Sequence, residues 1–260
     1  MERRKFLNKS ASAIVSYMGT LPLISLDTEA EKQALSLKPN SVILFQGDSI
    51  TEGWRSPEPP NYNFDNAGRE SLEYNDSNAL GSGYAFIAGS EILRAHPNKK
   101  IKIFNKGISG NKVDDLIKRW DKDCINIKPD VLSILIGVND FWDIITGNSK
   151  DAPEKYYEDY SKLLNITVEA LPQTKLIICE PFAITGTKAV NESWFPAFNV
   201  YRDAARKLAA EFNAIFIPFQ SVFDKAVSKA AGSYWCYDGV HPSIPGSNLM
   251  ARAWLKAVKL

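Results

Sequence analysis

Residues 41–49 read SVILFQGDS, an apolar run that ends in glycine, aspartate and serine. Short runs rich in β-branched and aromatic residues are typical of buried strands, in which both faces are covered. Four further runs of this kind follow, and each also ends in polar or glycine residues: 101–105, 131–136, 175–179 and 214–217. The sequence therefore predicts five strands, of which residues 41–45 form the first.

Segments with apolar residues at helical spacing separate these runs. They cover residues 84–96, 113–125, 154–171, 196–212, 220–230 and 247–258. Strands that alternate with helices form parallel sheets with helices on both faces. We therefore expect an α/β fold, a three-layer α/β/α sandwich with a mainly parallel five-stranded sheet.

Composition excludes several classes of protein. The chain has 260 residues, a formal net charge of +1 and 45% hydrophobic residues, so it can bury a sizeable core but offers no strongly basic surface for nucleic acid. No apolar run approaches the ~20 residues of a membrane-spanning helix. The three cysteines lack the clustered spacing of a zinc site and leave room for at most one disulfide.

Two irregular segments interrupt the alternation of strands and helices, at residues 54–83 and 182–195. Each follows the carboxyl end of a predicted strand, where ligands bind in open parallel sheets. We interpret both as walls of a binding cleft. A surface insertion without function is the alternative.

The chain contains two histidines. His96 lies at a predicted helix end, where it can cap carbonyl groups in water. His241 follows Asp238 by three residues in a turn, and this spacing can bring the carboxylate against the ring. A carboxylate on Nδ1 is what orients a histidine general base, although the D-x-x-H pattern alone is also common by chance.

Polar residues follow the first three predicted strands. Ser49, in Gly-Asp-Ser, would be exposed as a nucleophile at the sheet edge, or would cap a helix. Gly107, in Asn-Lys-Gly-Ile-Ser-Gly, could offer a backbone N–H to an oxyanion, whereas the spacing of a phosphate-binding loop is absent. Asn139, in Gly-Val-Asn-Asp, could donate its amide to the same oxyanion, or occupy an ordinary turn.

The set of four motifs resembles the SGNH hydrolase superfamily, also called GDSL-like esterases. The motifs are GDS with Ser49, N-x-G-x-S-G with Gly107, G-x-N-D with Asn139, and D-x-x-H with Asp238 and His241. The resemblance covers about residues 41 to 260. The first motif reads GDSI rather than GDSL, which leaves the serine in place. An α/β-hydrolase is disfavoured because no G-x-S-x-G elbow occurs.

The resemblance implies a serine esterase with the flavodoxin-like SGNH fold. Ser49 would be the nucleophile, His241 its base and Asp238 the group that orients His241. The backbone N–H groups of Ser49 and Gly107 and the side chain of Asn139 would form the oxyanion hole. The implied reaction needs no metal and no organic cofactor.

The irregular segments are rich in aromatic and amide side chains, which suit sugars better than long acyl chains. Because SGNH relatives often act as carbohydrate acetylesterases, we expect the substrate to be an acetylated sugar or polysaccharide. Hydrolysis of lipid, lysophospholipid or thioester substrates is an alternative, and so is a non-catalytic glycan-binding domain on the same fold. The candidate substrate-binding residues are Asp48, Trp54, Tyr62, Asp140 and Trp194.

The N-terminus suggests export. The run Arg3-Arg4-Lys5-Phe6-Leu7 resembles a twin-arginine signal and precedes a mildly apolar stretch from Ala11 to Ile24. We therefore expect residues 1–35 to be an export signal and tail, residues 36–260 to be the catalytic domain, and the protein to be periplasmic or secreted. A cytoplasmic protein with a basic N-terminal helix is the alternative.

Overall fold

Five parallel strands form one sheet in the computed structural model, which describes residues 35–56 and 73–260. The strands are β1 (Val42–Gly47), β2 (Lys102–Asn105), β3 (Val131–Leu135), β4 (Lys175–Cys179) and β5 (Ile215–Ile217). Their order across the sheet is β2-β1-β3-β4-β5, and every neighbouring pair is parallel. The predicted five-stranded α/β fold is confirmed, and the sheet is wholly parallel.

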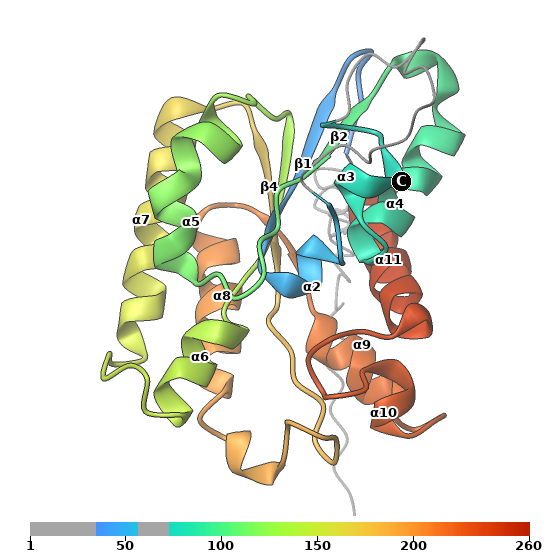
Figure 1. The fold of residues 1–260 in the computed structure, drawn as a ribbon. Coiled ribbons are helices and arrows are strands. Elements are labelled where there is room, and N and C mark those ends of the chain that lie inside the picture. Colours follow the sequence, from blue (N-terminus) through green and yellow to red (C-terminus); the bar gives the residue numbers. More distant parts are fainter. Residues whose placement is uncertain (1–34, 57–72) are drawn as a thin grey trace, which may run out of the picture. The chain divides into compact units, whose positions relative to one another are not determined.

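Helices cover both faces of the sheet (Figure 1). One layer contains α5 (Val113–Trp120), α7 (Glu154–Ala170) and α8 (Asn199–Glu211), which contact one another in that order. The other layer contains α4 (Tyr84–Ala95), α9 (Phe219–Ala226) and α11 (Ile244–Val258), and α11 contacts both of its partners. The chain therefore forms the predicted α/β/α sandwich.

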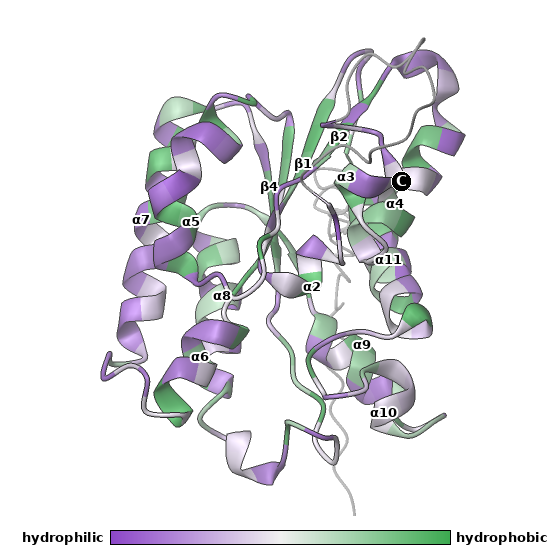
Figure 2. Ribbon diagram, in the orientation of Figure 1, coloured by the Kyte–Doolittle hydropathy of each residue, from purple (hydrophilic) through white to green (hydrophobic). Residues whose placement is uncertain are grey.

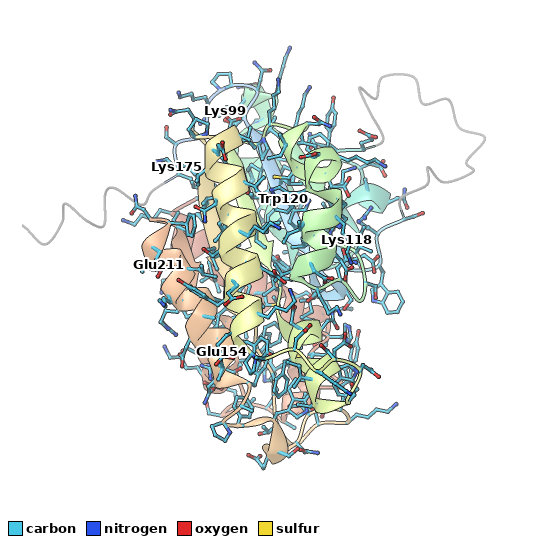
Figure 3. The ribbon with its side chains drawn as sticks, turned by 90° about the vertical axis from the view of Figure 1, so that its left-hand side faces the viewer. Lys99, Lys118, Trp120, Glu154, Lys175 and Glu211 are labelled. Carbon is cyan, nitrogen blue, oxygen red and sulfur yellow. The ribbon has the colours of Figure 1, made fainter. Side chains whose placement is uncertain are left out.

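Burial explains why the strands read as continuous apolar runs. Every residue of β3 is buried, because helices cover both faces of this central strand. Figure 2 shows hydrophobic residues concentrated on the strands, and mixed hydropathy on the helices. Figure 3 shows the layer of α5, α7 and α8 from outside. These helices carry charged side chains such as Lys118, Glu154 and Glu211.

Two buried tryptophans make satisfied polar contacts, one within a helical layer and one between a helix and the sheet. Trp120 donates its ring N–H to the Thr167 hydroxyl at 2.9 Å, between α5 and α7. Trp254 on α11 donates to the Ser133 hydroxyl of β3, also at 2.9 Å. Large rings are buried at low cost when their N–H groups find such partners.

Several helices extend or depart from the predicted pattern. Residues 137–140, for which an ordinary turn was the alternative interpretation, begin α6 (Val138–Ile145), which buries Val138 and Phe141 one turn apart. Single-turn helices α2 (Ser49–Glu52), α3 (Ser77–Leu80) and α10 (Gly232–Trp235) lie in segments without helical periodicity. A π-helical turn at Asp121–Ile125 completes the predicted helix 113–125.

The structure also resolves the cysteine question. Cys124, Cys179 and Cys236 are all buried and free, so no disulfide forms among them. Burial raises the pKa of each thiol. No helix in residues 35–56 and 73–260 is long and apolar enough to cross a bilayer. The predicted export signal lies almost wholly outside the described residues.

Candidate active site

The sheet order brings three of the predicted residues to one edge. Strand β1 lies between β2 and β3, so the segment after β1, with Ser49, is flanked by the segments that carry Gly107 and Asn139. These segments all follow carboxyl strand ends, because the strands are parallel. The placement is therefore a direct product of topology.

The fourth motif completes a chain of hydrogen bonds. The hydroxyl of Ser49 lies 2.8 Å from Nε2 of His241, and Nδ1 of His241 lies 2.6 Å from Oδ2 of Asp238. The other carboxylate oxygen of Asp238 accepts the backbone N–H groups of Val240 and His241, at 3.0 and 2.8 Å. Gly239 adopts a φ of 102°, which suits glycine and closes the tight turn. Sequence spacing thus predicted this contact correctly.

The turn also fixes the charge on Asp238. Partial burial disfavours the carboxylate, but the hydrogen bonds from the His241 and Val240 backbone and from the His241 ring outweigh it and lower the pKa of Asp238. The group therefore stays ionised at neutral pH. An ionised Asp238 holds the proton on Nδ1 and leaves Nε2 to accept from Ser49.

Ser49 is the first residue of α2, and this short helix is fixed at both ends. The Asp48 side chain caps it by accepting the N–H of Ile50 at 2.9 Å. Gly53 ends it with a φ of 55°, and a Cβ there would lie 2.7 Å from the backbone nitrogen of Gly83. The capping role considered for Gly-Asp-Ser thus belongs to Asp48, and the Ser49 hydroxyl is left to contact His241. As the first helical residue, Ser49 has a backbone N–H without an intrahelical acceptor.

Asn139 and Gly107 differ in what their N–H groups already do. The Asn139 amide donates to the backbone oxygen of Asn111 at 3.0 Å, which orients the group and leaves its second hydrogen for a ligand. The Gly107 N–H donates to the Asn105 side chain at 2.9 Å, so an oxyanion would have to share it. A Cβ at Gly107 would collide with the backbone of Thr51 and Glu52. The glycine is required here for close approach to α2.

Two arginines that the sequence reasoning missed hold the loop from Gly107 to Asn111. Arg55 donates from Nε to the backbone oxygen of Gly107 at 2.8 Å. Arg119 donates from Nε to the Asn111 side-chain oxygen at 2.8 Å and pairs with Asp123 at 3.1 Å. A further contact of Arg119 reaches the backbone oxygen of Gly47 at 3.4 Å. The pairing of Arg119 with Asp123 at i,i+4 was visible in the sequence, but its loop contacts were not.

The two predicted substrate-binding carboxylates differ in exposure, since Asp48 is buried and Asp140 is half-buried. Asp48 is only 1% exposed, and burial raises its pKa to about 7, against the lowering effects of the Ile50 N–H and His241. Burial likewise raises the pKa of Asp140 to about 7, although the Val113 N–H donates to it at 3.2 Å. One oxygen of each carboxyl group has no hydrogen-bond partner in the described residues. Asp48 is therefore a helix cap and not a surface ligand for substrate.

The three predicted aromatic residues have different outcomes. Trp54 follows α2 and is 85% exposed, so its ring is free to contact substrate. Trp194 is 3% exposed and packs against Phe141 and Phe198, which contradicts its predicted role in binding substrate. Tyr62 lies outside the described residues. Tyr237, which precedes Asp238 and is 52% exposed, was missed by the sequence reasoning.

No group of three or more histidine, cysteine or acidic side chains is arranged to hold a metal ion within the part of the chain that the structure describes. His96 ends α4 as its C-terminal cap and is separate from the histidine of the hydrogen-bond chain. Ser49, His241 and Asp238 therefore form the one constellation suited to nucleophilic chemistry that we identify in these residues.

Comparison with known proteins agrees with this geometry. Residues 45–249 match the GDSL-like Lipase/Acylhydrolase family. An acetylxylan esterase from Geobacillus stearothermophilus is 34% identical over 221 residues, which cover 83% of this chain and 93% of that protein.

Solved structures give the same picture. A protein from Parabacteroides merdae, described as a GDSL-like lipase, shares 45% identity with a TM-score of 0.79 and covers 87% of this chain and 99% of its own. The acetylxylan esterase Axe2 from Geobacillus stearothermophilus shares 29% identity with a TM-score of 0.73, over 87% of this chain and 97% of its own. Its catalytic mutants include replacements of a serine and of a histidine by alanine.

Proposed function

The chain belongs to the GDSL-like lipase/acylhydrolase family and is a carboxylic ester hydrolase, and from this premise we propose that it removes acetyl groups from carbohydrates by a Ser-His-Asp mechanism. The observation that carries the mechanism is the continuous hydrogen-bond chain from Ser49 through His241 to Asp238. Ser49, His241 and Asp238, the proposed nucleophile, base and orienting group, are already within hydrogen-bond distance of one another along this chain without substrate.

The first half-reaction transfers the acyl group to Ser49. The Ser49 oxygen attacks the ester carbonyl carbon while Nε2 of His241 takes the hydroxyl proton. The carbon–oxygen bond to the sugar then breaks, and Nε2 returns that proton to the departing alkoxide oxygen. Asp238 stabilises the imidazolium between these two transfers. The products are an acetyl-serine ester and a free sugar hydroxyl.

The negative charge on the carbonyl oxygen needs donors that are already in place. The backbone N–H of Ser49 and the second amide hydrogen of Asn139 would supply them at the N-terminus of α2. The N–H of Gly107 would be a third donor to this oxygen, shared with the side-chain oxygen of Asn105. In the second half-reaction, water loses a proton to His241 and attacks the acetyl-serine, which releases acetate and restores Ser49.

A carbohydrate substrate is supported by the acetylxylan esterases among the relatives and by exposed rings beside the triad. Trp54 follows the helix that bears Ser49, and Tyr237 is adjacent to Asp238. Aromatic faces that are exposed beside hydrogen-bonding groups bind the C–H face of a sugar ring, whereas a lipase would expose a wider aliphatic surface.

The deciding experiment measures acetate release from a panel of acetylated saccharides, together with hydrolysis of p-nitrophenyl acetate and octanoate. We expect release from acetylated xylo-oligosaccharides and a preference for acetate over octanoate. The Ser49→Ala variant should lose both activities while keeping its fold by circular dichroism. Faster cleavage of the octanoyl ester would favour the lipid alternative, and binding of saccharides without turnover would favour a glycan-binding domain.

Export is a separate proposal. The basic pair Arg3-Arg4 and the following apolar stretch are typical of a twin-arginine signal. Cell fractionation should find the full chain outside the cytoplasm, and the Arg3→Lys, Arg4→Lys double variant should stay inside. Lys9→Arg serves as the control, because it likewise exchanges one basic side chain for another without changing the charge. An unchanged location for the double variant would refute the proposal.

A further inference from the structure

A cavity lies on the β4 and β5 side of the same sheet edge, and none of the triad residues lines it. Residues of the irregular segment 182–195, of α8 and of α9 line it, and it encloses about 360 Å³. This size falls within the range of small-molecule pockets. The segment predicted from sequence to wall a cleft therefore does line a cavity, although Trp194 is not among the lining residues.

The floor of this cavity is rigid. Gln220 is 5% exposed, and its amide donates to the Ala183 oxygen at 3.0 Å and to Asp224 at 2.8 Å. Its side-chain oxygen accepts the Ala183 N–H at 2.9 Å. Both the nitrogen and the oxygen of this amide have hydrogen-bond partners within the protein. Gln220 therefore positions Asp224 and the backbone of Ala183 without needing a ligand.

The lining combines rings with polar groups. Phe195 contributes half-buried aromatic surface, whereas Phe223 is fully buried, and Glu192, Asn199 and Asp224 contribute hydrogen-bonding oxygens and an amide. A sugar ring needs this combination, because its C–H face packs on aromatic carbon and its hydroxyls donate to carboxylates.

Charge excludes an anionic occupant. Arg202 also lines the cavity, but it donates to the fully buried Glu180 at 3.2 Å, and Arg206 pairs with the same carboxylate at 3.3 Å. The lining itself carries one positive charge, on Arg202, and two negative charges, on Glu192 and Asp224, and therefore a net charge of −1. A neutral polyhydroxylated ligand fits this balance, and an acidic sugar does not.

The cavity shares a wall with the catalytic turn. Ile184 lines the cavity, and its N–H donates to the Gly239 oxygen at 2.9 Å. The Thr187 hydroxyl donates to the backbone oxygen of Asp238, also at 2.9 Å. Segment 183–187 therefore has the cavity on one side and the residues that orient His241 on the other.

We propose that this cavity is an accessory subsite, which binds a neutral, unreacting sugar unit of the oligosaccharide whose acetyl group is cleaved at Ser49. The inference rests on the proposed carbohydrate function and deepens it. Binding energy from a remote sugar unit lowers KM for long substrates and has no effect on substrates too short to reach the cavity. Chain length is therefore the variable that tests it.

Two variants remove the subsite without touching the triad. Val227→Trp places a ring in the cavity from a position that is 40% exposed, and Asn199→Ala removes one hydrogen-bonding side chain. Their matched controls are Ser228→Trp and Asp203→Ala, exposed neighbours that do not line the cavity. Circular dichroism and thermal melting establish that all four proteins are folded.

Kinetics are measured with p-nitrophenyl acetate, acetylated xylobiose and acetylated xylohexaose. For the hexaose we expect Val227→Trp and Asn199→Ala to raise KM by about tenfold and about fivefold, the effect of one or two hydrogen bonds. The values for p-nitrophenyl acetate and the biose should match wild type, as should all values for the controls. Titration with unacetylated xylohexaose should show the same order of binding.

The outcomes separate this inference from the function on which it rests. If wild type releases no acetate from any saccharide, the carbohydrate proposal fails. If release is normal and the cavity variants match their controls on the hexaose, the subsite alone is refuted. Displacement of bound hexaose from the cavity by spermidine but not by xylobiose would assign the cavity to organic cations and would also overturn the proposal.

Discussion

Arg119 donates to the side-chain oxygen of Asn111 at 2.8 Å, and the backbone oxygen of Asn111 in turn accepts from the Asn139 amide at 3.0 Å. Helix α5 thereby reaches the proposed oxyanion donor through one intermediate residue. Arg119 also touches the Gly47 oxygen, two residues before Ser49. The segments after three strands are thus tied to one largely buried guanidinium.

Replacing Arg119 with lysine should lower kcat by about tenfold while KM changes little. An ammonium group is a single point of contact and cannot hold Asn111, Asp123 and Gly47 together as a planar fork does. Steady-state kinetics with p-nitrophenyl acetate measure the effect, and Lys118→Ala is the control because Lys118 is an exposed neighbour on α5. A wild-type kcat for Arg119→Lys would show that the contact is only structural.

Replacing Asn139 with alanine should lower kcat by about 10²–10³, the usual loss for one oxyanion donor. KM should be nearly unchanged, because the amide acts on charge that develops only in the transition state. The measurement is kcat and KM for an acetyl ester. A variant with a raised KM and normal kcat would place Asn139 in ground-state binding instead.

Replacing Asp238 with asparagine should lower kcat by about 10²–10⁴, because a neutral amide neither fixes the His241 tautomer nor stabilises the imidazolium. The asparagine oxygen can still accept the N–H groups of Val240 and His241, so the turn should persist. Circular dichroism tests folding, and Asp114→Asn on the surface controls for loss of charge. Activity near wild type would remove Asp238 from the mechanism.

Replacing Asp48 with asparagine should weaken the pH dependence of stability. The pKa of Asp48 is raised to about 7 by burial, whereas an unfolded aspartate titrates near about 3.9. Between these values the native state keeps a proton that the unfolded chain releases, so the free energy of unfolding falls as pH rises, by at most about 1.4 kcal/mol per pH unit. Asparagine removes this term and still caps Ile50.

Chemical denaturation between about pH 5 and pH 8 measures this effect. The variant should gain stability relative to wild type as pH rises through that interval. Asp140 titrates in the same range and keeps part of the dependence in both proteins. Parallel curves for the two proteins would show that Asp48 does not bind a proton in the native state.

The strands and the triad could be predicted because their signals are local. An apolar run such as β3 is readable from its own letters, and Asp238 and His241 are only three residues apart. The parallel order then brings Ser49 beside Asn139 without further information. The prediction that Trp194 binds substrate was wrong, because composition shows that a loop is aromatic but not whether its rings face solvent or the core. Its burial depends on Phe141, which is distant in sequence.

Contacts between distant positions account for the other differences. Arg119 reaches Asn111 and Gly47, and nothing in its neighbourhood of the sequence specifies either partner. Asp48 was predicted to bind substrate, whereas it is buried and caps α2. Gly107 is a local exception: its N–H was expected to face an oxyanion, but Asn105, only two residues earlier, accepts from it.

The arrangement along the sheet has a consequence for protein engineering. Ser49 follows β1, Asn139 follows β3, and Asp238 and His241 lie in the turn near the C-terminus. The accessory cavity is built from the segments after β4 and β5. A randomised library confined to Glu192, Phe195 and the cavity-facing positions of α8 and α9 would therefore alter which glycans are selected. The hydrolytic machinery would be inherited unchanged by every member of that library.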